Sequence, residues 1–133
     1  ARIEGGKMTK ILIVDDEPYM RILIQEALEE LEEKGIVLLT VDSGDEAIAS
    51  VRREKPTLII LDVMMPGMNG YEVCNVVKNE LGMKDVFVMM LTAKGQKYDK
   101  EQGMDAGADI YITKPFDPNE IVNKVVAVLN ITI

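Results

Sequence analysis

The sequence of 133 residues contains no histidine and no tryptophan, and it has a single cysteine, Cys74. Without histidine the chain lacks the commonest general base and the commonest ligand of transition metals, and any phosphohistidine must belong to another molecule. One cysteine excludes an internal disulfide and a thiolate zinc cluster, and it is typical of a reducing compartment. We expect Cys74 to be a small core residue.

Long apolar runs are also missing. No run approaches the roughly 20 residues that span a bilayer, and the N-terminus lacks the apolar stretch of a signal peptide. Basic charge is scarce, because the net charge is -8 and the pI is about 4.6. These features argue against membrane insertion and against direct binding to a nucleic-acid backbone, and they predict a cytoplasmic protein.

The length fits one domain. Met8, followed by Thr9 and Lys10, has the pattern of a native start immediately before an apolar run. We therefore interpret residues 1–7 as a tail added in cloning, and we expect the domain to span residues 8–131.

Short apolar runs alternate with amphipathic stretches along this domain. The runs predict strands over residues 11–14, 36–41, 57–61, 86–91 and 109–113. The stretches between and after them predict helices over residues 18–34, 45–54, 70–81, 98–104 and 118–130. This alternation indicates an α/β fold, a doubly wound sandwich in which helices cover both faces of a five-stranded parallel sheet.

Four of the predicted strands end on polar side chains. Asp15 and Asp16 follow the first strand, Asp62 the third, Thr92 the fourth and Lys114 the fifth. The carboxyl ends of parallel strands share one edge of a sheet, where ligands of such folds bind. Three carboxylates with a hydroxyl and an ammonium favour a phosphoryl group and a hard cation, Mg²⁺ first, with Mn²⁺ or Ca²⁺ as possible substitutes.

Each of these residues also has a plain structural interpretation. Acidic residues gather in loops for solubility, and neighbours such as Asp15 and Asp16 point to opposite faces of a regular strand unless the backbone curls. Thr92 could simply terminate a strand, and most lysines are solvated. Lys114 precedes a proline, which makes this bond a candidate cis peptide that would aim the ammonium inward.

The chain closely resembles the receiver domain of bacterial two-component response regulators, in particular the single-domain regulators of chemotaxis. The resemblance extends from Met8 to about Leu129 and is carried by four motifs in the right order and spacing: Ile11–Glu17, Leu61–Gly70, Leu91–Ala93 and Lys114–Phe116. It implies the flavodoxin-like (βα)5 fold with strand order 2-1-3-4-5.

The resemblance also implies a metal-assisted phosphorylation. Asp62 would be the phosphoacceptor, and its donor would be the phosphohistidine of a sensor histidine kinase or a histidine phosphotransfer protein. Mg²⁺ would be held by Asp16, Asp62 and the backbone carbonyl of Met64, with Asp15 acting mainly through bound water. Such a protein is a phosphoacceptor switch, and it catalyses only its own phosphorylation and dephosphorylation.

The response to phosphorylation is implied in the same way. Thr92 and Lys114 would contact the phosphoryl group, and the ring of Tyr111 would move inward as Thr92 shifts. A half-buried strand aromatic is the plain alternative for Tyr111.

Two surfaces are candidates for partners. Tyr19, Met20 and Ile22 begin the first helix beside the predicted pocket, and we expect them to be the docking contacts of the kinase. The last helix has a broad apolar stripe, from which a strip such as Val126 is available to a partner or a second copy. In the family this side, with helix 4 and strand 5, transmits the signal to a downstream protein or output domain, and it could form a dimer.

Other functions explain the pattern less well. A phosphatase of the haloacid dehalogenase class normally has a second acid two residues after the nucleophile, where this chain has Met64. A flavodoxin-like flavin site would place a phosphate beside Asp15, Asp16 and Glu17, which would repel it. No glycine-rich loop of the Walker type is present. An inert, receiver-shaped interaction module remains an alternative.

Overall fold

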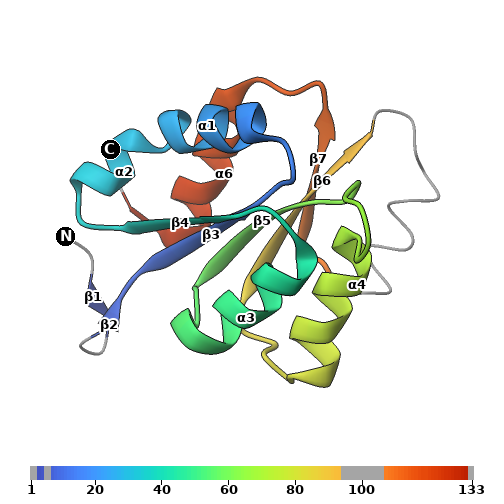
Figure 1. Cartoon of the computed structure of the whole chain (residues 1–133). Helices are drawn as coiled ribbons and strands as arrows, with labels where there is room; N and C mark the ends of the chain where they lie inside the picture. Colours follow the sequence, from blue (N-terminus) through green and yellow to red (C-terminus); the bar gives the residue numbers. More distant parts are fainter. Residues whose placement is uncertain (1–2, 5–6, 94–106, 132–133) are drawn as a thin grey trace.

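The computed structural model describes residues 3–4, 7–93 and 107–131 (Figure 1). Its main sheet has five parallel strands: β3 (Lys10–Val14), β4 (Val37–Val41), β5 (Leu58–Asp62), β6 (Phe87–Ala93) and β7 (Ile110–Lys114). They are arranged in the order β4-β3-β5-β6-β7, which is the predicted 2-1-3-4-5 when these strands are numbered along the chain. The predicted parallel sheet is therefore confirmed.

A separate two-stranded antiparallel sheet precedes the main one. It consists of β1 (Ile3–Glu4) and β2 (Lys7–Met8), so most of it lies within residues 1–7. None of its residues belongs to the main sheet. The site at the carboxyl edge is built without it.

Helices cover both faces of the main sheet. The helices α1 (Pro18–Ala27), α2 (Glu29–Glu33) and α6 (Pro118–Leu129) lie on one face, and α3 (Gly44–Glu54), α4 (Gly70–Asn75) and the π-helical η1 (Val76–Glu80) lie on the other (Figure 1). No helix in the described part of the chain is long and apolar enough to cross a membrane.

Side-chain alternation along the strands divides the core into two layers. In β3, Ile11 and Ile13 pack towards α1 and α6, whereas Leu12 and Val14 pack towards α3 and α4. All five residues of β5 are buried, because this strand is central and covered on both sides. Cys74 is also fully buried in the second layer, as expected.

Two predicted helices are interrupted. The helix predicted over residues 18–34 breaks at Leu28, which leaves helical geometry at φ -97° and ψ 12°. A short bond of 3.0 Å from the Leu31 N–H to the Leu28 carbonyl tightens the chain there, and both leucines are fully buried. The break therefore keeps both side chains in the core, and Gly35, with a φ of 95°, follows α2.

The helix predicted over residues 70–81 changes type instead of breaking. After α4 the chain widens into the π-helical η1, where the Leu81 N–H bonds to the Val76 carbonyl at 2.7 Å. The helix predicted over residues 98–104 lies outside the described residues.

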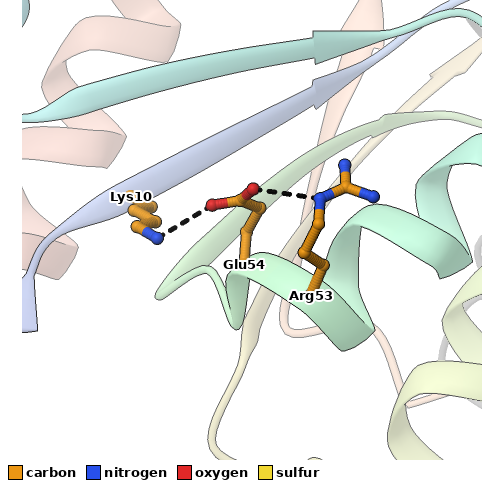
Figure 2. Close-up of polar contacts among 3 residues, drawn as sticks. All are labelled: Lys10, Arg53 and Glu54. Carbon is orange, nitrogen blue, oxygen red and sulfur yellow. Dashed lines mark hydrogen bonds and ion pairs between the residues drawn. The ribbon is translucent and has the colours of Figure 1, made fainter.

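The amino end of the sheet is joined to α3 by an ion-pair cluster. Glu54, the last residue of α3, accepts from Lys10 of β3 at 2.9 Å and from Arg53 at 3.1 Å (Figure 2). These groups are partly solvated, so the cluster adds little to stability. It marks the edge opposite to the one where the polar strand ends meet.

Candidate functional site

The carboxyl ends of four neighbouring strands place the predicted polar residues together. Asp62 is the last residue of β5 and pairs in register with Leu91, the residue before Thr92 in β6. Lys114, the last residue of β7, pairs with Ala93. Asp15 directly follows β3, which lies on the other side of β5.

Three carboxylates form a compact cluster at this edge. Asp15, Asp16 and Asp62 each offer an oxygen within 4.8 Å of those of the other two. Asp15 is 1% exposed and Asp62 is 2% exposed, whereas Asp16 is partly exposed. Oxygen ligands from a few carboxylates, open to water on one side, suit Mg²⁺.

A change in backbone direction after Val14 brings Asp15 and Asp16 to the same place. The Asp15 N–H bonds to the Val41 carbonyl at 3.3 Å, and the Asp15 Oδ1 then accepts from the Glu17 N–H at 2.9 Å. This local turn replaces the strand geometry that would have sent the two side chains to opposite faces.

Burial makes two of these carboxylates, Asp15 and Asp62, hard to ionise. Desolvation raises the pKa of Asp15 to about 6, and the neighbouring charges of Asp62 and Asp16 add to the rise. Desolvation also raises the pKa of Asp62, although the hydrogen bond and the positive charge of Lys114 oppose the effect. A divalent cation would relieve the same repulsion, so the carboxylates fit such an ion.

The lysine predicted for the pocket points into it. The Lys114 Nζ lies 2.8 Å from the Asp62 Oδ1, and the lysine side chain is 27% exposed. The Lys114–Pro115 bond is cis, as the sequence suggested. Lys114 therefore holds a positive charge directly beside the Asp62 carboxylate.

Two buried polar atoms at this edge have no hydrogen-bond partner in the described part of the protein. They are the hydroxyl of Thr92, a residue that is 1% exposed, and the Oδ2 of Asp15. Buried polar groups are seldom left unpaired, and exceptions are common at functional sites. Both atoms are available to a group that enters the site.

The remaining predicted residues surround this centre. Met64 is 69% exposed in the loop after β5, and Tyr111 is half-buried against the core layer of α3 and α4. Tyr19 and Ile22 are 66% and 54% exposed, whereas Met20 packs partly against the α1 and α6 layer. The exposed part of the predicted docking surface is thus Tyr19 with Ile22.

Sequence reasoning missed one residue that shapes the site through its lack of a side chain. A Cβ on Gly70 would lie 2.5 Å from the carbonyl oxygen of Asp62 and 2.9 Å from the Cα of Val63. The start of α4 can therefore approach the backbone of Asp62 only because residue 70 is glycine. The capping box of Asn69 and Glu72 was the available signal, since it places Gly70 at the first position of a helix.

The fold and the site together define a class of protein: a doubly wound parallel sheet with an acidic, lysine-containing pocket at its carboxyl edge. A family model described as the response regulator receiver domain matches residues 11–126. The chain belongs to this family.

Similar proteins agree with this assignment. The chain is 43% identical over 120 residues to the alkaline phosphatase synthesis transcriptional regulatory protein PhoP of Bacillus subtilis, covering 90% of this chain and 48% of PhoP. It is 44% identical over 122 residues to the phosphate regulon transcriptional regulatory protein PhoB of Pseudomonas aeruginosa, covering 92% of this chain and 52% of PhoB. The chain thus spans about half the length of these curated relatives.

Solved structures show the same architecture. The chemotaxis response regulator CheY4 of Vibrio cholerae superposes with a TM-score of 0.81 at 30% identity, covering 92% of this chain and 99% of CheY4. The response regulator DrrB of Thermotoga maritima, described as an OmpR/PhoB homologue, superposes with a TM-score of 0.80 at 32% identity. The match covers 92% of this chain and 53% of DrrB.

Proposed function

We propose that this domain is a phosphorylation-activated switch and that Asp62 is its phosphoacceptor. The observation that carries the proposal is the position of the Asp62 carboxylate, which lies beside two further carboxylates and 2.8 Å from the Lys114 ammonium. The proposed donor is the phosphohistidine of a sensor histidine kinase or a histidine phosphotransfer protein, as membership of the receiver family suggests. This chain has no histidine of its own, so the phosphohistidine lies outside it.

In the proposed reaction a carboxylate oxygen of Asp62 attacks the phosphorus of the donor. The new P–O bond forms as the P–N bond breaks, and the imidazole nitrogen leaves with the electron pair of that bond. Phosphoryl transfer needs chiefly in-line positioning and compensation of charge on the phosphoryl oxygens. We infer that Lys114 and Thr92 provide two of these contacts. The Lys114 ammonium lies 2.8 Å from the Asp62 Oδ1, and the buried Thr92 hydroxyl has no hydrogen-bond partner among the described residues.

The acidic cluster fits a magnesium ion by its chemistry. Asp15, Asp16 and Asp62 are hard oxygen donors, and the buried Oδ2 of Asp15 has no protein partner among the described residues. The Met64 carbonyl is the proposed fourth protein group. When bound, Mg²⁺ supplies positive charge to the phosphoryl oxygens, and Mn²⁺ or Ca²⁺ could occupy the same position.

The signal is proposed to leave the site through Thr92 and Tyr111. A phosphoryl group on Asp62 adds roughly two negative charges and strong acceptors, which would draw the Thr92 hydroxyl and Lys114 inward. The space vacated by Thr92 would admit the half-buried Tyr111 ring and change the surface of β7 and α6. In the proposal this surface also includes the helix predicted over residues 98–104, which lies outside the described residues. This surface would control a downstream protein, an output domain or a second copy of the domain.

The length of the relatives suggests what the switch controls. PhoP and PhoB are named as transcriptional regulators and are about twice as long as the matched region. We therefore infer that this receiver acts on transcription through an output domain or a separate partner. With a net charge of -8, this domain is not expected to contact DNA directly.

The test is phosphorylation by acetyl phosphate or phosphoramidate with Mg²⁺, followed by intact-mass analysis. One added phosphoryl group is expected for the native chain and for Asp85→Asn, an exposed carboxylate in the loop before β6, and none for Asp62→Asn. Equal labelling of Asp62→Asn would overturn the assignment.

The same purified protein can be used to distinguish the alternative functions. A phosphatase of the haloacid dehalogenase class would hydrolyse many equivalents of a phosphomonoester such as p-nitrophenyl phosphate. An inert interaction module would accept no phosphoryl group from either small donor. The switch instead predicts stoichiometric labelling and no sustained turnover of phosphomonoesters.

A further inference from the structure

Arg21, in the first half of α1, contacts the acidic cluster in an unexpected way. Its guanidinium Nη1 donates to the backbone carbonyl of Asp15 at 2.7 Å, in a partly buried position. Within the described part of the chain the guanidinium makes no ion pair with Asp15, Asp16 or Asp62. The Arg21 guanidinium thus lies close to the cluster but binds the main chain of Asp15, and it leaves the carboxylate oxygens free to bind a metal ion.

Among the residues that the structure describes, the carbonyl that Arg21 holds accepts no other hydrogen bond. The ladder of β3 with β4 and β5 ends at Val14, and α1 begins only at Pro18. The Arg21 N–H also bonds to the Glu17 carbonyl at 3.2 Å, but this is a main-chain bond of the first turn of α1 that any residue here would make. The bond to the Asp15 carbonyl is the one that depends on the arginine side chain. A hydrogen bond from a charged donor is stronger than one between neutral groups.

With Arg21 in place, nearly every polar group of Asp15 is held. Its N–H bonds to Val41, its Oδ1 accepts from the Glu17 N–H, and its carbonyl accepts from Arg21. The Oδ2 alone is left without a partner among the described residues. The peptide that joins Asp15 to Asp16 therefore has a fixed orientation, and this orientation decides where both side chains point.

We propose that Arg21 is a positioning residue for the divalent cation of this site, acting through the main chain of Asp15. The inference rests on the proposed function, because it assumes that the cluster binds Mg²⁺. Groups that orient metal ligands typically change metal affinity by about 10-fold to 100-fold when they are removed.

The positive charge of Arg21 should weaken Mg²⁺ binding, whereas its hydrogen bond to the Asp15 carbonyl should strengthen it. The two effects have opposite signs, so a measurement can separate them. Removing a positive charge near three carboxylates would tighten cation binding if charge were the main effect, whereas losing the bond to the Asp15 carbonyl would weaken it. Arg21→Met removes both the charge and the donor, and Arg21→Lys keeps the charge with a single-point donor.

The experiment measures the Mg²⁺ dissociation constant of the intact chain by calorimetry, with thermal unfolding in the absence of Mg²⁺ as the second measurement. We expect binding about 10-fold weaker in Arg21→Met and an intermediate value in Arg21→Lys. Arg52→Met, on the exposed side of α3, is the matched control and should bind as the native chain does. Labelling of Arg21→Met by acetyl phosphate should be slow at limiting Mg²⁺ and recover at saturating Mg²⁺.

Each other outcome has a definite meaning. Native or tighter Mg²⁺ binding by Arg21→Met overturns the positioning role, as does a fall in unfolding temperature with an unchanged dissociation constant. If the native chain itself binds no Mg²⁺, the metal part of the proposed function fails and takes this inference with it. If the native chain binds Mg²⁺ and Asp62 is labelled, a negative result in Arg21→Met concerns Arg21 alone.

Discussion

Asp15 illustrates how a proposed metal ligand can oppose the stability of the protein that carries it. Its carboxyl group is buried, and its pKa is raised to about 6 from an ordinary value of 3.8. The folded state therefore binds this proton more tightly than the unfolded state, and the contribution of Asp15 to stability falls as the pH rises from about 4 to about 6.

Replacing Asp15 by asparagine should consequently stabilise the metal-free protein at neutral pH. Asparagine keeps an oxygen for the Glu17 N–H and carries no charge. We expect a gain on the order of 1 kcal/mol at pH 7 and a smaller gain at pH 5, measured by urea unfolding in the presence of EDTA. Asp85→Asn serves as the exposed control. An equal gain at both pH values would contradict the assignment of the effect to the Asp15 charge.

Gly70 is constrained by contact with the backbone at the end of β5. Gly70→Ala would place a methyl group 2.5 Å from the Asp62 carbonyl oxygen and 2.9 Å from the Val63 Cα. Both of these contacted atoms belong to the backbone, which cannot move aside as a flexible side chain can. We predict a loss of about 1 to 3 kcal/mol in the free energy of unfolding. Phosphorylation of the variant should also slow, because the backbone of Asp62 must move. Native stability in urea unfolding would show that α4 can shift without cost.

At the level of elements, η1 is joined to β7 through a lysine that the site does not use. The Lys78 side chain is 5% exposed, and its ammonium lies 2.9 Å from the Asp109 Oδ2 and 2.9 Å from the Lys84 carbonyl. The same Asp109 oxygen accepts from the Val88 N–H at 2.8 Å. Lys78 thus connects η1 to the starts of β6 and β7.

This connection should respond unequally to the loss of its two partners. Asp109→Ala leaves a buried ammonium without its counter-ion and should cost about 3 kcal/mol, whereas Lys78→Met leaves a carboxylate that is 34% exposed and should cost less. Denaturant unfolding of both variants tests this order, with the exposed Lys124→Met as control. The reverse order would mean that the aspartate is the group that depends on its partner.

The elements also separate what local sequence predicts from what packing decides. The five strands of the main sheet were predicted within one or two residues, because continuous apolar runs bounded by polar residues are a strong local signal, whereas β1 and β2 were not predicted. The break at Leu28 and the π-helical turn of η1 were not predicted. Both lie where buried side chains contact partners distant in sequence. Leu28 and Leu31 pack in the core, and Lys78 of η1 pairs with Asp109.

For the whole molecule, the acidic cluster predicts a stability that depends on divalent cations. An ion that binds only the folded state stabilises it by about 2.7 kcal/mol at a free concentration 100 times its dissociation constant. We expect Mg²⁺ to raise the unfolding temperature in a saturable way, measured by differential scanning calorimetry. Sodium chloride at matched ionic strength is the control. Asp16→Asn should weaken the effect, and an equal rise with both salts would indicate screening of the net charge of -8.

The sequence alone determined the fold class, the polar residues at the strand ends and the edge of the sheet where they meet, because apolar periodicity and the geometry of parallel strands are local and general. Only the tertiary structure decided how Asp15 and Asp16 turn to one place, why residue 70 is glycine and which carbonyl Arg21 holds. These features depend on contacts between the ends of β3 and β5 and the helices that follow them. Such contacts exist only once the chain has folded, and no local pattern records their distances.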